Sequence, residues 1–302
     1  MNYAPIALFT YARLEHTRRT IDALLLNHTA SDHDLIIFSD GARSPEQRLA
    51  VEQVRSYLAT ISGFRSISIH HRPTNFGLAK SIIEGVTQVL SSHERIIVLE
   101  DDLVTSPHFL NYMNGALERF VNDERVVSIH GYVYPIEQDL PEAFFLRGAD
   151  CWGWGTWRRG WQLFNSDGQM LLSALKRANL LKTFDFNGTY GYSNMLKEQV
   201  AGLNDSWAIR WYAAAFLAEK LTLYPGRSLV HNIGNDGTGT HCGLVSDYDV
   251  RLSSSPIDLS GVQVLPSAAG WMAFESFFRK SQVSFFGRLR ARFKRSLLKI
   301  FV

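Results

Sequence analysis

The sequence has few cysteines and no long apolar run. Its 302 residues include only two cysteines, Cys151 and Cys242, which provide neither a disulfide framework nor the paired spacing of a zinc site. No apolar run approaches the roughly 20 residues needed to cross a bilayer. The apolar segment near the start has no basic stretch before it and no small-residue cleavage site after it. These absences predict a protein of the reducing cytoplasm without a signal peptide or a membrane-spanning segment.

The usual glycine-rich nucleotide-binding loops are also missing. The sequence has no G-x-G-x-x-G after the first apolar segment and no G-x-x-x-x-G-K-[ST] anywhere, which counts against a dehydrogenase or a P-loop enzyme. A sugar nucleotidyltransferase normally carries a glycine-rich loop at the same place. Here that place runs from Thr10 to Arg13, and both of these residues are predicted to contact a bound nucleotide. A surface arginine that starts a helix is the alternative for Arg13.

Acidic residues are absent after Glu275, where eight basic residues follow. The whole chain has 31 Lys and Arg and 29 Asp and Glu residues, so the body without these eight is formally acidic. We therefore predict a main domain over residues 1–275 and a basic amphipathic tail over 276–302. In residues 285–302, apolar and basic side chains lie on opposite sides at helical spacing, which is typical of a helix in an anionic membrane surface. A helix docked on the body and a calmodulin-like partner site are alternatives, and no basic stripe indicates nucleic acid.

Strand-like and helix-like patterns alternate through the first hundred residues. The strand patterns come first in each pair, at residues 6–9, 35–38, 67–71 and 96–99, with helical patterns at 14–26, 45–61 and 78–90. This order predicts an α/β fold with a mainly parallel, Rossmann-like sheet. Ligands of such sheets bind beyond the carboxyl ends of the strands. Further helical patterns follow at 170–181, 194–202 and 207–219.

Three consecutive carboxylates, Glu100, Asp101 and Asp102, follow the fourth strand pattern. They repel one another at the end of a buried strand, so the arrangement is costly unless a cation neutralises it. Mn²⁺ and Mg²⁺ prefer carboxylate oxygens and keep open positions for water and phosphate. We therefore predict a metal that bridges a diphosphate. A solvated acidic loop is the alternative.

These residues resemble the N-acetylglucosaminyltransferase I family and its bacterial relatives. The likeness spans roughly residues 4 to 245 and rests on the first strand with its arginine, Ser39-Asp40, Glu100-Asp101-Asp102-Leu103 and Asp205-Ser206-Trp207-Ala208-Ile209-Arg210. It implies a GT-A fold and an inverting enzyme that uses a nucleotide sugar and Mn²⁺. It further implies that Asp102 is the metal ligand, that Glu100 and Asp101 contact the sugar nucleotide, and that Asp40 contacts the uracil. Asp205 corresponds to the general base, although Ser206 stands where the family has a second acid.

The residues around Asp205 support that role independently. An inverting transfer needs one carboxylate to take the proton of the acceptor hydroxyl, and the apolar helical pattern that starts at Trp207 would anchor such a group. The alternative is a helix N-cap, because Asn204, Asp205 and Ser206 are all good capping residues. One residue can serve in both ways.

Tryptophans and histidines of the second half are further candidates. Four tryptophans lie within residues 151–161, and Trp154 is predicted to contact the donor, although such side chains are more often part of the core. Asp150, just before them, is a candidate for bonding a sugar hydroxyl. The glycine-rich segment 231–241 suits a loop that orders over the donor. His231 or His241 would then reach the diphosphate or the metal, and an ordinary surface loop is the alternative.

The sequence as a whole predicts a metal-dependent, inverting glycosyltransferase on the inner face of a membrane. Its donor is predicted to be a UDP-sugar, with N-acetylglucosamine or a related hexose, and its acceptor a glycan or a lipid-linked glycan. A sugar-phosphate nucleotidyltransferase is one alternative. A carbohydrate-binding or scaffold protein without catalysis is the other.

Overall fold

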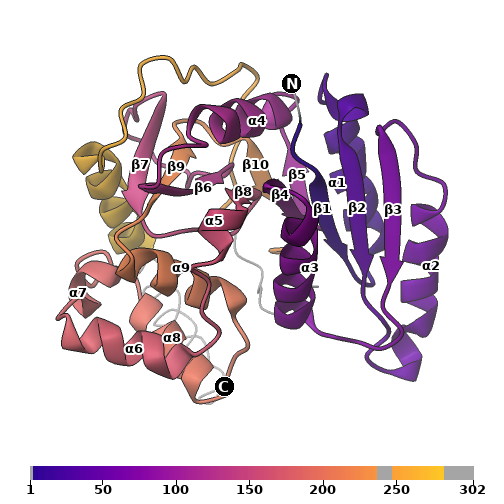
Figure 1. The fold of residues 1–302 in the computed structure, drawn as a ribbon, viewed down its shortest axis with the longest axis horizontal. Coiled ribbons are helices and arrows are strands. Elements are labelled where there is room, and N and C mark those ends of the chain that lie inside the picture. The colour runs from indigo at the N-terminus through magenta and orange to yellow at the C-terminus, as the bar shows by residue number, and fades with distance from the viewer. Residues whose placement is uncertain (1–2, 237–246, 282–302) are drawn as a thin grey trace, which may run out of the picture.

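The computed structural model describes residues 3–236 and 247–281. Its main feature is an eight-stranded sheet with the strand order β3-β2-β1-β4-β8-β6-β9-β7 (Figure 1). The strands are β1 (Ile6–Thr10), β2 (Asp34–Ser39), β3 (Ser66–His71), β4 (Arg95–Glu100), β6 (Val126–His130), β7 (Ala143–Arg147), β8 (Trp154–Trp157) and β9 (Leu221–Pro225). A separate antiparallel pair consists of β5 (Leu103–Thr105) and β10 (Val230–Asn232).

The helices cover both faces of this sheet. They are α1 (Leu14–Leu25), α2 (Arg48–Leu58), α3 (Leu78–Ser92), α4 (Phe109–Arg119), α5 (Arg158–Trp161), α6 (Gly168–Arg177), α7 (Leu181–Phe184), α8 (Tyr192–Val200), α9 (Trp207–Leu217) and a helix over residues 268–281. Figure 1 shows α1 and α2 with β1–β3 at one end of the molecule and α6–α8 at the other. In the described part of the chain, no helix is long and apolar enough to span a membrane.

Strand directions confirm the predicted mainly parallel α/β sheet. β1 pairs in parallel with both β2 and β4, β2 pairs in parallel with β3, and β6 does so with β9. β8 is antiparallel to its two neighbours β4 and β6, and β7 is antiparallel to β9. The sequence patterns predicted none of the strands from β5 to β10. β8, for example, has only four residues, Trp-Gly-Thr-Trp, and so short a segment shows no clear alternation of apolar and polar side chains.

Alternation along β1 sends side chains into two separate cores. Ile6 and Leu8 pack with α1, α2 and α4 on one face, whereas Ala7 and Phe9 pack with α3 and the tryptophans on the other. The predicted helical pattern over residues 45–61 includes Leu49, whose side chain is 71% exposed, because it lies on the side of α2 opposite the buried Val51, Val54 and Leu58.

The helix over residues 268–281 closes a third core at the end of the sheet. Its Phe274 and Phe278 are each 1% exposed and pack with side chains of α6, α8 and α9. The predicted boundary between residues 275 and 276 lies inside this helix. The predicted amphipathic tail segment 285–302 lies outside the described residues, and so does His241.

Candidate functional site

The carboxyl ends of β1, β2 and β4 meet at one edge of the sheet. The amide of Asp40 donates to the carbonyl of Thr10 at 3.0 Å, which ties the end of β2 to that of β1. The amide of Tyr11 donates to Oδ2 of Asp101 at 3.3 Å, which ties the end of β1 to that of β4. Parallel pairing therefore brings the predicted donor residues of three strands together, as ligand sites in such sheets require.

Arg13 pairs with two carboxylates of the acidic triplet. Its Nη2 lies 2.5 Å from Oδ1 of Asp101 and 2.7 Å from Oδ2 of Asp102. Burial acts to lower the pKa of the guanidinium, but the two aspartates reverse that effect and raise it. The predicted need for a cation is thus met in part by the chain itself, from a position just before α1. A diphosphate can therefore contact Arg13 in two ways: it binds next to the two aspartates, or it replaces them as the partner of the guanidinium.

One guanidinium does not balance three carboxylates. Loss of water contact, followed by repulsion from Asp102 and Asp101, raises the pKa of Glu100 to about 8. Burial also raises the pKa of Asp101, against the opposing effect of Arg13. The site therefore retains an excess of negative charge or a bound proton, and a further cation would be stabilised there.

The acidic triplet fits a divalent cation that is held partly by protein carboxylates and partly by the phosphates of a bound ligand. In the residues described, no three His, Cys, Asp or Glu side chains are arranged as a metal-binding group. Carboxylates are the donors that Mg²⁺ and Mn²⁺ prefer, and Mg²⁺ is often held by one or two of them together with substrate phosphates. The side chains of Asp101 and Asp102 are 6% and 12% exposed, so Asp102 is the more accessible of the two.

Gly234 lies against Asp102, a contact that the sequence did not indicate. The amide of Ile233 donates to the carbonyl of Asp102 at 2.9 Å, which holds the segment after β10 over the triplet. A Cβ atom at position 234 would collide with Oδ2 of Asp102 and approach Arg13. Only glycine fits this close approach. The sequence signal that could have indicated this close approach is a glycine two residues after the short strand β10.

Asp40 accepts four hydrogen bonds within the protein. The donors are the backbone amides of Gly41, Phe76 and Gly77 and the side-chain amide of Asn75, at 2.8 to 3.0 Å. The residue is 5% exposed. Its carboxylate therefore fixes the loop that leads into α3. The predicted contact with uracil stays a prediction. Thr10 is also buried, and its hydroxyl has no hydrogen-bond partner among the described residues.

Replacing Asp40 with alanine is expected to destabilise the fold by about 3 kcal/mol, because buried amide donors lose a charged acceptor. Guanidinium unfolding measures the change in the free energy of unfolding. Asp40→Asn keeps one carbonyl oxygen and should cost about half as much. A loss below about 1 kcal/mol for Asp40→Ala would show that the loop is held by other contacts.

Trp154 lies in the core, in contrast to its predicted contact with the donor. It is 1% exposed, and its ring centroid lies 5.5 Å from that of Trp207, 5.8 Å from that of Trp161 and 5.9 Å from that of Trp211. β8 directs the side chain onto the face that α3 and α9 cover. No surface of Trp154 is available to a ligand in this structure.

Asp205 lies in the turn before α9, with its side chain 74% exposed. Its Oδ1 is 3.2 Å from Nη2 of the buried Arg210. The N-cap is Ser206, whose hydroxyl accepts from the amide of Ile209 at 3.2 Å. The capping alternative therefore applies to Ser206 and leaves the Asp205 carboxylate accessible. The role of Asp205 as general base remains a prediction.

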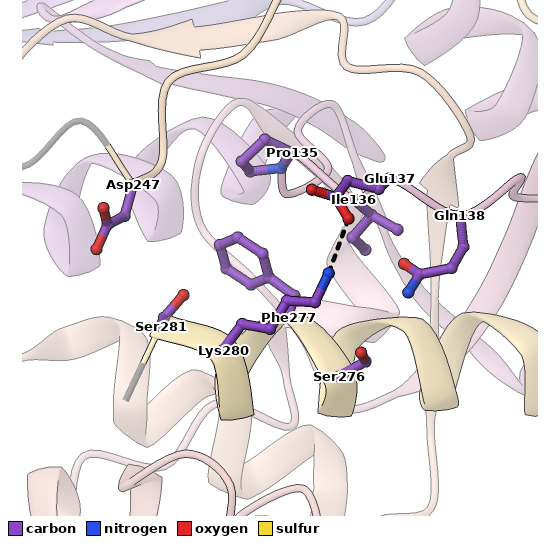
Figure 2. Close-up of a pocket in the computed structure, with 9 residues that line it drawn as sticks. All are labelled: Pro135, Ile136, Glu137, Gln138, Asp247, Ser276, Phe277, Lys280 and Ser281. Atoms are coloured by element: carbon purple, nitrogen blue, oxygen red, sulfur yellow. Dashed lines mark hydrogen bonds and ion pairs between the residues drawn. The ribbon is translucent and has the colours of Figure 1, made fainter. Parts of the chain in front are cut away.

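His231 is held by backbone contacts on β10. Its Nδ1 lies 2.8 Å from the carbonyl oxygen of Val250, and its Nε2 lies 3.9 Å from Oδ1 of Asp249. Two cavities lie in the same half of the molecule. One of about 370 Å³ is bordered by Tyr134, Ser228 and Val250. The other, of about 220 Å³, lies between Pro135, Phe277 and the ion pair of Lys280 with Glu137 (Figure 2).

The parallel sheet with acidic residues at the end of β4 defines a GT-A-like glycosyltransferase fold. Residues 6–157, half of the chain, match the family model for glycosyl transferase family 2. The chain belongs to this family. The more specific resemblance to the N-acetylglucosaminyltransferase I family remains a prediction. No curated protein matches the chain.

Three solved structures illustrate how distant the structural neighbours are. The mannosyltransferase PcManGT from Pyrobaculum calidifontis, in complex with GDP-Man and Mn²⁺, is 12% identical with a TM-score of 0.30, and the alignment covers 44% of this chain and 36% of that one. S. aureus TarS 1–349 is 9% identical with a TM-score of 0.40, over 76% and 60%. Glucosyl-3-phosphoglycerate synthase from Mycobacterium tuberculosis, with Mn²⁺, UDP and glucosyl-3-phosphoglycerate, is 10% identical with a TM-score of 0.32, over 59% and 67%. Such likeness does not identify the donor, acceptor or metal of this chain.

Proposed function

We propose that this glycosyltransferase is metal-dependent and inverting, and that it moves N-acetylglucosamine or a related hexose from a UDP-sugar onto a glycan or a lipid-linked acceptor. The observation that supports this most is the arrangement at the sheet edge. Arg13 there faces Asp101 and Asp102, and the carboxylates outnumber the guanidinium. The inverting reaction and the donor come from the family resemblance.

Mn²⁺ or Mg²⁺, when bound, would supply positive charge for the diphosphate and the leaving nucleotide. Asp102 is the proposed ligand, because it is the more exposed member of its pair. Arg13 would contribute a second positive charge beside the phosphates. Asp205 would hold the proton of the acceptor hydroxyl, and its exposure leaves room for an acceptor to approach.

The proposal is tested with a panel of UDP- and GDP-sugars in the presence of Mn²⁺. We expect slow hydrolysis of one UDP-sugar, seen as release of UDP without any acceptor. Release of pyrophosphate from a sugar phosphate and a nucleoside triphosphate would instead identify a nucleotidyltransferase. Glycan binding without turnover of any nucleotide sugar would identify a binding protein.

We also propose that the basic tail associates with an anionic membrane surface on the cytoplasmic side. Deleting residues 282–302 removes this segment and keeps the helix over 268–281, whose Phe274 and Phe278 are core residues. The truncated enzyme should hydrolyse its donor in solution as before. Sedimentation with vesicles that contain an anionic lipid should be lost, and that of the intact chain should weaken in high salt. Unchanged sedimentation after truncation would contradict this proposal.

A further inference from the structure

Asp150 lies at the same sheet edge as the acidic triplet. β8 runs antiparallel to β4 with Trp154 opposite Val98, so the residues that precede β8 lie beside those that end β4. Electrostatic effects agree with this placement. Burial is the main cause of the raised pKa of Cys151, and Asp150, Glu100 and Asp102 add to it. The pairing of β8 with β4 therefore places Asp150 and Cys151 near the acidic triplet.

The carboxylate of Asp150 has unused hydrogen-bonding capacity. Its Oδ1 accepts from the amide of Cys151 at 2.9 Å, and its Oδ2 accepts only a long hydrogen bond, of 3.5 Å, from the hydroxyl of Tyr224. His130 Nε2 lies 3.8 Å from the same oxygen. His130 is fully buried, burial lowers its pKa, and neither ring nitrogen has a hydrogen-bond partner in the described structure. Most buried polar groups in folded proteins are hydrogen-bonded, so His130, beside Asp150, is an exception.

Half-buried aromatic side chains gather in the neighbourhood of this carboxylate. They come from separate segments of the chain and are Tyr134, Trp152, Tyr190, Tyr192 and Tyr248. Burial is the main cause of the raised pKa of Tyr134, Tyr190 and Tyr192, and Asp150 adds to it in each. Neighbouring rings are in contact, with centroids 4.4 Å apart for Tyr190 and Tyr192. The side chain of Asp150 is 22% exposed, so the carboxylate is partly open to solvent.

This combination suits a neutral sugar. A pyranose ring has apolar C–H faces that pack on aromatic rings, and tyrosine and tryptophan also offer a polar group at the ring edge. A hydroxyl can donate to Oδ2 of Asp150, whereas an anionic nucleotide would be repelled. The surface also continues outward, because Tyr134 borders the cavity of about 370 Å³ and stacks on Phe277 of the smaller cavity at 4.9 Å.

We propose that Asp150 and the aromatic side chains near it form the subsite for the acceptor sugar. Asp150 is a positioning residue there, and its carboxylate accepts a hydrogen bond from a sugar hydroxyl. The inference rests on the proposed glycosyltransferase function. The subsite lies next to the donor edge, so a sugar held there has its hydroxyl near the proposed donor site. The adjoining cavities give room for the next sugar of a longer glycan.

The test uses Asp150→Asn and methyl glycosides of the common hexoses and N-acetylhexosamines as acceptors. Asparagine keeps an oxygen for the amide of Cys151, so the loop should stay in place. Hydrolysis of the donor without acceptor should be unchanged. The KM for the accepted glycoside should rise about 10-fold to 100-fold, with a much smaller change in kcat, as expected for the loss of one hydrogen bond to a charged group.

Asp22→Asn is the matched control, because Asp22 is exposed on α1 and should change neither constant. An equal loss of donor hydrolysis in Asp150→Asn would place Asp150 in the donor site and overturn the proposal. So would an unchanged KM, or a wild-type enzyme that hydrolyses its donor but uses none of the glycosides.

A second measurement separates this proposal from the proposed function. Trp152 is half-buried in the cluster, and its ring centroid lies 4.8 Å from that of Tyr132. Binding of a methyl glycoside should therefore change tryptophan fluorescence, and Trp152→Phe should remove that change. This result is expected even if no nucleotide sugar is hydrolysed, in which case only the proposed function fails. A response to choline and to none of the glycosides would indicate a cation site and overturn the acceptor subsite.

Discussion

Asp102→Ala is expected to lower turnover of the donor by about 10³-fold or more. A metal contributes several kcal/mol to the stabilisation of charge in the transition state, and about 1.4 kcal/mol corresponds to a tenfold change in rate. Donor affinity should fall as well, because the diphosphate would then face Glu100 and Asp101 without the charge of the metal, and Arg13 alone does not balance them. UDP release and calorimetric titration with UDP in Mn²⁺ measure the two effects.

Removal of the metal provides the second arm of this experiment. EDTA should abolish turnover of the unmodified chain, and added Mn²⁺ or Mg²⁺ should restore it. Asp22→Ala removes an exposed carboxylate of α1 and serves as the control for the substitution. Full activity in EDTA would contradict the metal prediction and would leave Arg13 as the cation that faces the diphosphate.

Asp205→Asn is expected to lower transfer to the acceptor by about 10²-fold to 10⁴-fold, the usual contribution of a positioned general base. Asparagine has the same size but takes up no proton at neutral pH. Because Asp205 is exposed and Ser206 caps α9, unfolding temperature and donor affinity should stay nearly constant. Initial rates with saturating donor and acceptor measure the effect.

Ser206→Ala is the matched control for the neighbouring position. It removes the cap and should lower stability by about 1 kcal/mol, with little effect on transfer. The stereochemistry of the product is a further check, since an α-linked donor should give a β-linked product, visible in the NMR coupling of its anomeric proton. Retention of configuration would remove the assigned role of Asp205. Inversion by a fully active Asp205→Asn would move that role to another carboxylate.

Much of the fold could be predicted because its signals are local. The four strand patterns and three helical patterns of the first hundred residues correspond to β1–β4 and α1–α3, within one or two residues at most ends. Leu49 shows the limit of such patterns, since this apolar side chain lies on the exposed side of α2, opposite the buried Val51, Val54 and Leu58. The strands from β5 to β10 were missed, and each has only three to five residues, which leaves little room for a period of two residues.

The sequence predicted where the candidate site lies on the sheet, but not which partners its side chains have. Parallel strands place their carboxyl ends at one edge, so Thr10, Asp40 and Glu100 were predicted to lie together, and hydrogen bonds between these strand ends join them. The partners of each side chain could not be predicted. Asp40 is engaged by a loop more than 30 residues away, and Trp154 has a tryptophan core around it.

The sequence by itself determined the order of strands and helices in the first hundred residues and the acidic end of β4, because periodicity and the identity of neighbouring residues depend on a few consecutive positions. The tertiary structure decided that Arg13 pairs with Asp101 and Asp102, 88 and 89 residues away. It also decided that Asp150 lies beside the triplet among tyrosines from distant segments. Such contacts depend on how the strands and helices pack against one another, which no local pattern contains.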